Sequence, residues 1–153
     1  MQRLGFEDAI EVVVSDGAVW QPEESVDTVL LDAPCSATGT IRRHPEVMHL
    51  KSPQDVEQLA DLQMRLLRNS AKMLKQGGIL IYCTCSLQKD EGERQIDLFL
   101  ENNKDFERLP VSPEEIGGLN DAITQQGDVR ILPYFMAAQG GMDGFFISRL
   151  VRK

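Results

Sequence analysis

Two short strings could carry covalent chemistry, because each places a cysteine directly after an apolar run. The first is Asp32–Ser36 (Asp-Ala-Pro-Cys-Ser) and the second is Thr84–Ser86 (Thr-Cys-Ser). Open α/β sheets bind their ligands at the carboxyl ends of parallel strands. A thiol at such an end becomes a nucleophile once its pKa is lowered. Two such thiols indicate a reaction with two thiol-dependent steps.

Addition to a pyrimidine ring is one reaction that such thiols could perform. A thiolate is a soft nucleophile that can attack the electron-poor carbon 6 of the ring. Carbon 5 then becomes enamine-like and accepts a methyl group from an electrophilic donor, and a base must remove the carbon 5 proton before the thiol leaves. An acidic side chain near ring nitrogen 3 assists the addition by holding a proton there. Asp32, three residues before Cys35, stands at the same predicted strand end.

Simpler explanations compete for each cysteine. A cysteine at a strand end is most often a small buried hydrophobe, and Cys83 is best interpreted in this way. A zinc site made of Cys35, Cys83 and Cys85 is disfavoured, because Cys-x-Cys is not the usual zinc spacing and no fourth ligand is evident near the two histidines. We therefore expect no metal. A thiol-redox protein would normally use Cys-x-x-Cys, which the sequence lacks.

The composition limits the class of protein. The 153 residues suffice for one domain with a sizeable core, and the hydrophobic (42%) and charged (26%) fractions are those of a globular protein. The apolar runs are too short to cross a bilayer, and the N-terminus has no hydrophobic signal core. Three cysteines do not make a disulfide framework. We expect a reduced, cytoplasmic protein without a membrane partner.

The charge bears on nucleic-acid binding. A net charge of −8 argues against a general polyanion binder, because phosphate affinity rests on Lys and Arg. Arg42, Arg43 and His44 nevertheless form a local basic cluster, and four more cations follow in a predicted helix. If RNA is the substrate, most of the electrostatic attraction must come from outside this chain.

Strands and helices must position the cysteine strings. Residues 1–8 are interpreted as the tail of a helix that Gly5 ends. Strands are predicted over Ala9–Ser15, over Val26–Leu31, which lacks alternation and so suits burial on both faces, and over Ile79–Thr84.

The longest helix is predicted to begin at Ser52, with Pro53 at its first position and Asp55 closing a capping box. It should end at Gln76–Gly78, with Gly77 in the left-handed conformation.

The remaining elements are shorter. We predict a helix over Glu91–Glu101, an irregular stretch over 103–128, and two last strands at Val129–Tyr134 and Gly144–Val151. The order of elements predicts an α/β sheet layered with helices, in one domain.

Longer segments of the sequence resemble a known family. Asp32–Glu46 (DAPCSATGTIRRHPE) resembles the fourth motif of RNA cytosine-5 methyltransferases, most closely the bacterial Sun/Fmu (RsmB-like) branch, which modifies 16S ribosomal RNA. Tyr82–Ser86 resembles the sixth motif, and Asp143–Ile147 resembles the C-terminal strand. The resemblance implies a partial Rossmann-like, S-adenosylmethionine-dependent methyltransferase fold. Its sheet would be mostly parallel, with a C-terminal antiparallel strand pair.

The resemblance also implies roles for the thiols. Cys85 would attack carbon 6 of a cytosine, and Cys35 would help to release the methylated product by acting on the carbon 5 proton or on the covalent adduct. Asp32 would lie between the base and the methyl donor, S-adenosyl-L-methionine.

The other site residues come from the same resemblance. Asp16 matches the acidic residue on the adenine side of the cofactor, although an ordinary turn aspartate is the alternative. Ala33 and Pro34 would shape the cofactor loop next to Asp32. Arg42 and Arg43 would touch RNA phosphate or orient their loop, and a solvated basic turn is the competing interpretation.

The sequence also departs from the family. The glycine-rich cofactor loop on the first strand, the acidic ribose-binding residue after the second and the N-terminal RNA-binding domain are not among these residues. Residues 1–153 therefore match the C-terminal portion of a catalytic domain, and we expect this chain to be inactive alone. The alternative is a non-catalytic remnant or subunit that keeps an RNA- or protein-facing surface. Gly92 stands where the family usually has Asn, which would loosen the following helix.

The family's strand order, 3-2-1-4-5-7-6, places the two absent strands between Ala9–Ser15 and Val26–Leu31. Without them, Val26–Leu31 becomes an open apolar edge, which tends to pair with another chain. We expect one of three outcomes: a homodimer through that edge, a first strand re-paired onto it, or a longer protein whose N-terminal segment covers it.

Overall fold

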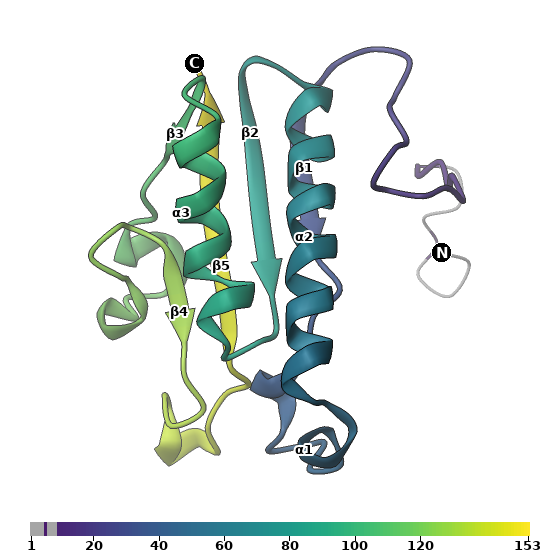
Figure 1. The fold of residues 1–153 in the computed structure, drawn as a ribbon. Coiled ribbons are helices and arrows are strands. Elements are labelled where there is room, and N and C mark those ends of the chain that lie inside the picture. The colour runs from purple at the N-terminus through teal and green to yellow at the C-terminus, as the bar shows by residue number, and fades with distance from the viewer. Residues whose placement is uncertain (1–4, 6–8) are drawn as a thin grey trace.

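A mixed five-stranded sheet forms the centre of the structure, a computed structural model that describes residue 5 and residues 9–153 (Figure 1). The strand order is β1-β2-β5-β3, and β4 also pairs with β5. Only β1 and β2 are parallel, whereas β5 runs antiparallel to β2, β3 and β4. The mostly parallel sheet expected from the sequence is thus wrong for the described residues. The strands are β1 (Val26–Asp32), β2 (Leu74–Thr84), β3 (Phe106–Arg108), β4 (Val129–Ile131) and β5 (Phe145–Arg152).

The parallel pair β1 and β2 ends at one edge of the sheet. Asp32 lies opposite Cys83 in the register, so both cysteine strings leave the sheet side by side. β1 confirms the strand predicted at Val26–Leu31, but Leu30 is 66% exposed. Burial on both faces was therefore wrong, because α2 (Pro53–Met73) and α3 (Glu93–Asn102) lie on the same face of the sheet (Figure 1).

Local sequence signals define helix α2. The Ser52 hydroxyl accepts a hydrogen bond from the Asp55 backbone N–H, and the Asp55 carboxylate accepts one from the Ser52 N–H at 2.8 Å. This capping box satisfies donors that a helix start otherwise leaves free. The helix ends at Met73, earlier than predicted, and β2 follows at once. Gly77 has the expected positive φ (+78°), but it lies in an irregular part of β2.

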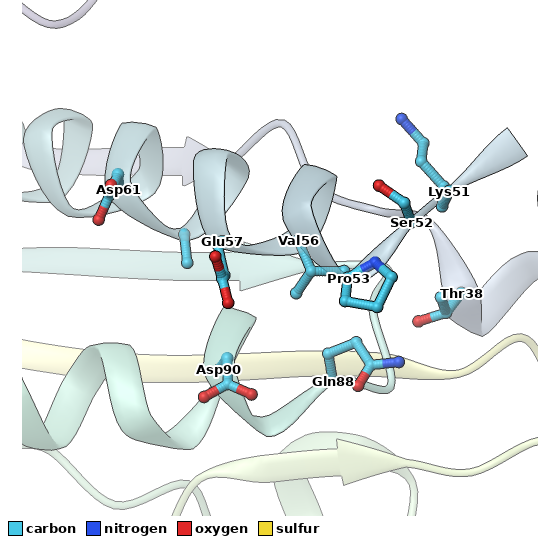
Figure 2. A pocket seen from close by; sticks show the side chains of 10 residues that line it. Thr38, Lys51, Ser52, Pro53, Val56, Glu57, Asp61, Gln88 and Asp90 are labelled. Atoms are coloured by element: carbon cyan, nitrogen blue, oxygen red, sulfur yellow. The ribbon is translucent and has the colours of Figure 1, made fainter.

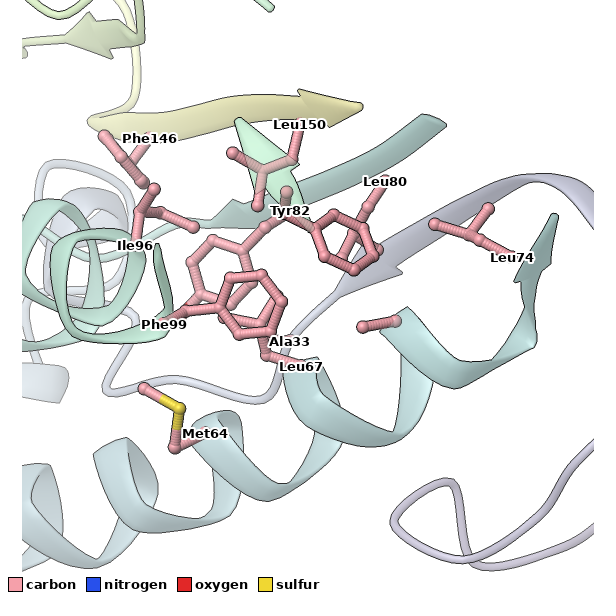
Figure 3. Close-up of a cluster of buried hydrophobic side chains, with 12 residues drawn as sticks. Ala33, Met64, Leu67, Leu74, Leu80, Tyr82, Ile96, Phe99, Phe146 and Leu150 are labelled. Carbon is pink, nitrogen blue, oxygen red and sulfur yellow. The ribbon is translucent and has the colours of Figure 1, made fainter. Parts of the chain in front are cut away.

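The main core fixes β2 against both helices. Its fully buried side chains include Tyr82 from β2, Phe99 from α3, Phe146 from β5 and Leu67 from α2 (Figure 3). Burying a side chain of this kind stabilises the fold by about 1.5–3 kcal/mol. Tyr82 lies three residues before Cys85, so the core anchors the strand that carries this thiol.

The C-terminal half is more irregular than the sequence predicted. The stretch 103–128 contains the short strand β3 and two 3-10 turns, at Pro113–Ile116 and Asn120–Ala122. The strand expected at Val129–Tyr134 keeps only its first three residues as β4. Ala122, Val129 and Phe135 form a second, smaller core. A short helix, α1 (Val47–Leu50), precedes α2.

The strand predicted at Ala9–Ser15 is wrong. These residues have no strand structure, and Val14 is 97% exposed. A β-branched run becomes a strand only when a neighbour satisfies its backbone, and in the described residues no strand pairs with it. It is not re-paired onto β1 either. The helix tail predicted over 1–8 lies outside the described residues, apart from Gly5. No helix in the described part of the chain is long and apolar enough to cross a bilayer.

Candidate active site

The two cysteine strings meet where β1 and β2 end. The Sγ atoms of Cys35 and Cys85 lie 3.4 Å apart. The Ala33 N–H donates to the Cys83 carbonyl at 3.0 Å, which continues the β1–β2 pairing into the first cysteine loop. The Pro34 carbonyl accepts a hydrogen bond from Gln63 of α2 at 2.8 Å. The structure thus brings both thiols to one edge of the sheet, as two adjoining strand ends require.

The environment of Cys35 favours its protonated form. The pKa of the Cys35 thiol is raised from 9.0 to about 12, mainly by burial and in smaller part by the hydrogen bond with Cys85, while a hydrogen bond from the Ala37 backbone acts in the lowering direction. A thiol with this pKa keeps its proton at neutral pH. Cys35 can therefore donate that proton in a hydrogen bond to the sulfur of Cys85.

Cys83 on β2 and Asp32 on β1 are neighbours across the parallel pair. Cys83 is buried, and its Sγ lies 3.7 Å from both the Leu31 carbonyl and Asp32 Oδ1. Burial, and then the Asp32 charge, raise the pKa of the Cys83 thiol to about 12. Cys83 is thus a protonated packing residue, as expected. Asp32 is exposed, so its carboxylate can face a ligand at this edge.

A glycine lets the two loops and the last strand approach closely. The Gly39 N–H donates to the Cys85 carbonyl at 2.9 Å, and the Gly39 carbonyl accepts from the Gly144 N–H at 2.8 Å. A Cβ atom at Gly39 would lie 2.7 Å from the Cys85 carbonyl oxygen, which real side chains do not tolerate. Residue 39 must therefore be glycine for the Cys85 backbone to be held in this way.

Sequence reasoning missed Glu91. This fully buried residue ends the 3-10 turn Lys89–Glu91, and its carboxylate accepts hydrogen bonds from Ser36 and Ser86, the residues that follow the two cysteines. A glutamate within the polar string Asp-Glu-Gly-Glu looks solvated. The only available signal was that each cysteine is followed by serine.

Sequence reasoning also missed Arg130, whose position accounts for a residue without a side chain at position 92. Its Nη1 donates to the Ser86 carbonyl at 2.6 Å, its Nη2 pairs with Glu93 at 2.6 Å, and its guanidinium lies 4.7 Å from the Phe146 ring centre. A Cβ atom at Gly92 would collide with the Arg130 guanidinium. The absence of a side chain therefore makes room for Arg130, and α3 begins directly after, at Glu93.

Arg42 and Arg43 lie on the surface beside the last loop. Arg43 donates from both Nε and Nη2 to the Asp143 carboxylate and lowers the pKa of that carboxyl group. Arg42 donates to the Gly140 carbonyl at 2.6 Å and lies 3.5 Å from Asp143. In the structure, these arginines join their loop to the loop before β5. Their contacts therefore fit the loop-orienting interpretation.

Asp16 lies apart from the other cofactor candidates. Its Oδ1 accepts from the Ala18 N–H at 2.9 Å, and its carbonyl accepts from Val19 and Trp20. Asn69 of α2 holds this turn by donating to the Gly17 and Trp20 carbonyls. In the described residues, the contacts of Asp16 are those of a turn aspartate and do not link it to Asp32.

The comparison with protein families assigns the chain. The family model described as 16S rRNA methyltransferase RsmB/F matches residues 1–151. The chain belongs to this family.

Relatives and solved structures are similar to this RsmB/F-family chain. "Ribosomal RNA small subunit methyltransferase B" of Escherichia fergusonii is 38% identical over 157 residues, covering 100% of this chain and 33% of the relative. The protein of the same name from Shewanella oneidensis is 38% identical over 146 residues, covering 93% of this chain and 31% of the relative. The chain thus spans about a third of the length of these relatives, so their similarity alone does not show that this chain has the activity of the longer proteins.

Solved structures of other proteins share the fold, among them two from Pyrococcus horikoshii. NSun6 from Pyrococcus horikoshii, solved with SFG, matches with a TM-score of 0.73 and 25% identity, over 99% of this chain and 36% of that one. A methyltransferase homolog protein from the same organism matches with a TM-score of 0.63 and 31% identity, over 85% and 40%. These neighbours confirm the α/β methyltransferase fold of this RsmB/F-family chain.

A cavity of about 540 Å³ is lined by Thr38 and Gln88, from the loops that follow the two cysteines, but not by a cysteine. It opens between the start of α2 and the turn after β2, where the Glu57 and Asp90 carboxylates line it with Lys51 (Figure 2). Thr38 connects it to the site through a 3.1 Å contact with Ser86. The acidic lining does not suit phosphate. No group of three metal-binding side chains occurs among the described residues.

Proposed function

We propose that this chain forms the substrate side of an RsmB/F-type active site, which transfers a methyl group from S-adenosyl-L-methionine to carbon 5 of a cytosine in RNA. The observation that carries the proposal is the 3.4 Å contact between the Cys35 and Cys85 sulfur atoms beside the exposed Asp32. Family membership supports RNA of the small ribosomal subunit as the substrate. The free state of all three cysteines agrees with a reducing compartment, the cytoplasm.

Cys85 is the nucleophile in this proposal. Its sulfur forms a bond to carbon 6 while Asp32 holds a proton or hydrogen bond at the pyrimidine edge. S-adenosyl-L-methionine supplies the methyl group when it is bound. Cys35 keeps its proton at neutral pH, because its pKa is raised to about 12. It therefore acts on the adduct rather than on the carbon 5 proton. A base from the solvent takes that proton, the electron pair of the C5–H bond forms the C5–C6 double bond, and the sulfur–carbon bond breaks; the Cys35 S–H hydrogen bond stabilises the Cys85 thiolate that leaves.

The described residues fit the methyl donor only in part. Asp32, Ala33 and Pro34 lie at the end of β1 and would meet the cofactor there, whereas Asp16 is held in its own turn beside α2. Support for S-adenosyl-L-methionine also comes from the NSun6 neighbour, whose ligand SFG is an analogue of it. We infer that the cofactor side is completed by an N-terminal segment of a longer protein or by a second copy. Either would cover the exposed edge of β1, and the isolated chain would be inactive.

One observation favours a second candidate. The net charge of −8 and the use of the Asp16 carboxylate within its own turn suit a non-catalytic subunit that keeps the fold and an RNA- or protein-facing surface. Such a subunit needs no reactive thiol. Covalent reactivity of Cys85 with a pyrimidine therefore separates the two candidates.

Covalent trapping tests the proposal. The gene product that contains this chain is incubated with S-adenosyl-L-methionine and RNA carrying 5-fluorocytosine. This nucleobase has fluorine in place of the carbon 5 hydrogen, and a base cannot remove the fluorine, so the covalent adduct does not break down. We expect an adduct with the parent protein and with the Cys83→Ala control, and none with Cys85→Ala. An adduct that persists in Cys85→Ala would overturn the nucleophile assignment, and no adduct with the parent would favour the subunit.

A further inference from the structure

Four hydrogen bonds converge on the buried carboxylate of Glu91. Its Oε1 accepts from the Ser36 N–H at 2.8 Å and from Gln63 Nε2 at 3.0 Å. Its Oε2 accepts from the Ser36 hydroxyl at 2.5 Å and from the Ser86 hydroxyl at 2.6 Å. Glu91, Ser36, Ser86 and Gln63 each have zero exposure. The carboxylate thus uses essentially its full capacity of about four acceptor sites.

The chain position of these partners is informative. Ser36 follows Cys35 and Ser86 follows Cys85, so one carboxylate is bonded to the residue next to each thiol. The Ser36 and Ser86 hydroxyls also lie 3.1 Å from each other. Hydrogen bonds to a charged acceptor are roughly twice as strong as neutral ones. Glu91 therefore connects the loop after β1 to the loop after β2 at the level of the sulfur atoms.

Burial of this carboxylate is costly, because no cation takes part in its described contacts. An ionised side chain removed from water needs a compensating set of hydrogen bonds, and a packed apolar side chain would stabilise the fold at lower cost. The backbone of Glu91 is held separately, since Tyr82 and Thr84 of β2 donate to its carbonyl at 2.9 and 3.1 Å. The side-chain carboxylate is therefore available to accept hydrogen bonds from Ser36 and Ser86.

We propose that Glu91 is a positioning residue that sets the distance between the Cys35 and Cys85 sulfur atoms. The proposal rests on the proposed function, in which the Cys35 thiol must reach the Cys85 sulfur when the adduct breaks down. A contact of 3.4 Å leaves little tolerance, because a hydrogen bond to sulfur is lost with a shift of about 1 Å. Glu91 touches neither sulfur and acts through Ser36 and Ser86.

A trivalent arsenical measures this distance without any need for catalysis. Phenylarsine oxide reacts with two thiols: two S–H bonds break, two S–As bonds form, and the oxygen leaves as water without a change of oxidation state. Only two sulfur atoms held close together form the stable ring. The parent for this experiment is the Cys83→Ala chain, so that Cys35 and Cys85 are the only thiols. Intact mass and competition with a soluble dithiol give the affinity.

We expect Glu91→Leu to weaken the arsenical affinity by about tenfold or more, because it removes every side-chain bond between the two loops and Glu91. Glu91→Gln should recover most of the affinity, since its amide has the same shape and the serine hydroxyls can accept as well as donate. Glu101→Gln, an exposed change on α3, is the matched control and should have no effect. Unchanged affinity in a folded Glu91→Leu chain would overturn the proposal.

A second variant covers the case in which Glu91→Leu does not fold. Ser36→Ala combined with Ser86→Ala removes the hydroxyl arms but leaves Glu91 bonded to Gln63 and to the Ser36 N–H. We expect a weaker arsenical affinity with an unchanged alkylation rate of Cys85 by a monofunctional reagent. A merely structural defect would instead increase alkylation of both cysteines. Parent-like arsenical affinity in this double variant would also overturn the proposal.

Reaction with ordinary cytosine RNA separates this proposal from the proposed function. In the gene product that contains the chain, Glu91→Gln should turn over, whereas Glu91→Leu should accumulate the Cys85–RNA adduct because release is impaired. A parent protein that never reacts with RNA contradicts the proposed function but leaves the arsenical result standing. A reactive parent whose Glu91→Leu variant turns over normally contradicts the role of Glu91.

Discussion

Cys35 Sγ lies 3.4 Å from Cys85 Sγ, although 50 positions separate the two residues in the sequence. The contact exists because β1 and β2 are parallel neighbours that end at the same edge, and because Glu91 and Gly39 hold the loops that follow. The two sulfur atoms are not equivalent. Cys35 is the protonated partner, since burial raises its pKa to about 12.

The raised pKa predicts a pH-dependent alkylation of Cys35. The thiolate is the reacting form, so Cys35 in the folded chain should react slowly at neutral pH and faster as the pH approaches about 12. Peptide mapping by mass spectrometry after a timed exposure to iodoacetamide measures this, and the unfolded chain in urea is the control. Fast alkylation of Cys35 at neutral pH in the folded chain would contradict the prediction.

The same shift predicts how stability depends on pH. An unfolded cysteine titrates near 9.0, whereas folded Cys35 and Cys83 keep their protons up to about 12. Between these values the native state binds more protons than the unfolded state, so stability falls as the pH rises. Urea unfolding of the parent and of a Cys35→Ser, Cys83→Ser variant should show a smaller loss in the variant. Equal losses would argue against raised pKa values.

The close contact between Gly92 and Arg130 predicts coupling between them. Gly92→Ala should displace the guanidinium from the Ser86 carbonyl and destabilise the chain by about 1–3 kcal/mol, as overpacking does. In an Arg130→Ala background the same change should cost less, because the collision with the guanidinium is gone and only the looser approach to the Phe146 ring, at 3.2 Å, remains. Chemical denaturation of the four chains gives the coupling free energy. Strictly additive effects would exclude the clash.

Binding of S-adenosyl-L-methionine to the isolated chain should be weak. The turn that holds Asp16 is bonded to Asn69, so only the Asp32 end of the proposed cofactor site is present in the described residues. Isothermal titration calorimetry of the 153-residue chain should therefore give no micromolar signal. Tight binding by a monomer would show that the chain has a complete cofactor site and would remove the need for a covering segment.

The exposed edge of β1 predicts self-association of the isolated chain. β1 has one paired neighbour in the described residues, so its other edge is unpaired, and Leu30 is 66% exposed on the face of this edge strand that the helices leave uncovered. Sedimentation velocity should reveal association that rises with concentration, and Leu30→Lys should suppress it, because a lysine blunts a strand edge. Leu98→Lys on α3, where the leucine is 47% exposed, is the control. A chain that stays monomeric at all concentrations would contradict the prediction.

Local signals in the sequence predicted the elements that they control. The capping box at Ser52 and the two cysteine strings depend on residues a few positions apart, and the structure contains both features. The strand at Ala9–Ser15 failed because strand formation depends on a neighbour, which a β-branched run does not encode. The prediction of a mostly parallel sheet failed for a similar reason, because the antiparallel pairing of β5 with β2 joins segments that are far apart in the chain.

Glu91 shows the limit of sequence reasoning at the site itself. Its burial follows from the meeting of the β1 loop, the β2 loop and α2, and the contacts with Ser36 and Gln63 join residues 55 and 28 positions apart. The adjacent Asp90 is exposed and has the same charge. Which of the two acidic residues turns inward depends on the 3-10 turn before α3, and composition does not reveal it.

The central place of β5 in the sheet has a consequence for synthesis on the ribosome. β5 pairs with β2, β3 and β4, and Phe146 lies opposite Thr84, directly before Cys85. Until Phe145–Arg152 has left the ribosome, β2 can pair only with β1, and the other edge of β2 stays unpaired. The sheet around the thiol site is therefore complete only after β5 has emerged. A ribosome that stalls before these residues would present an unpaired β2 edge and two accessible cysteines to chaperones.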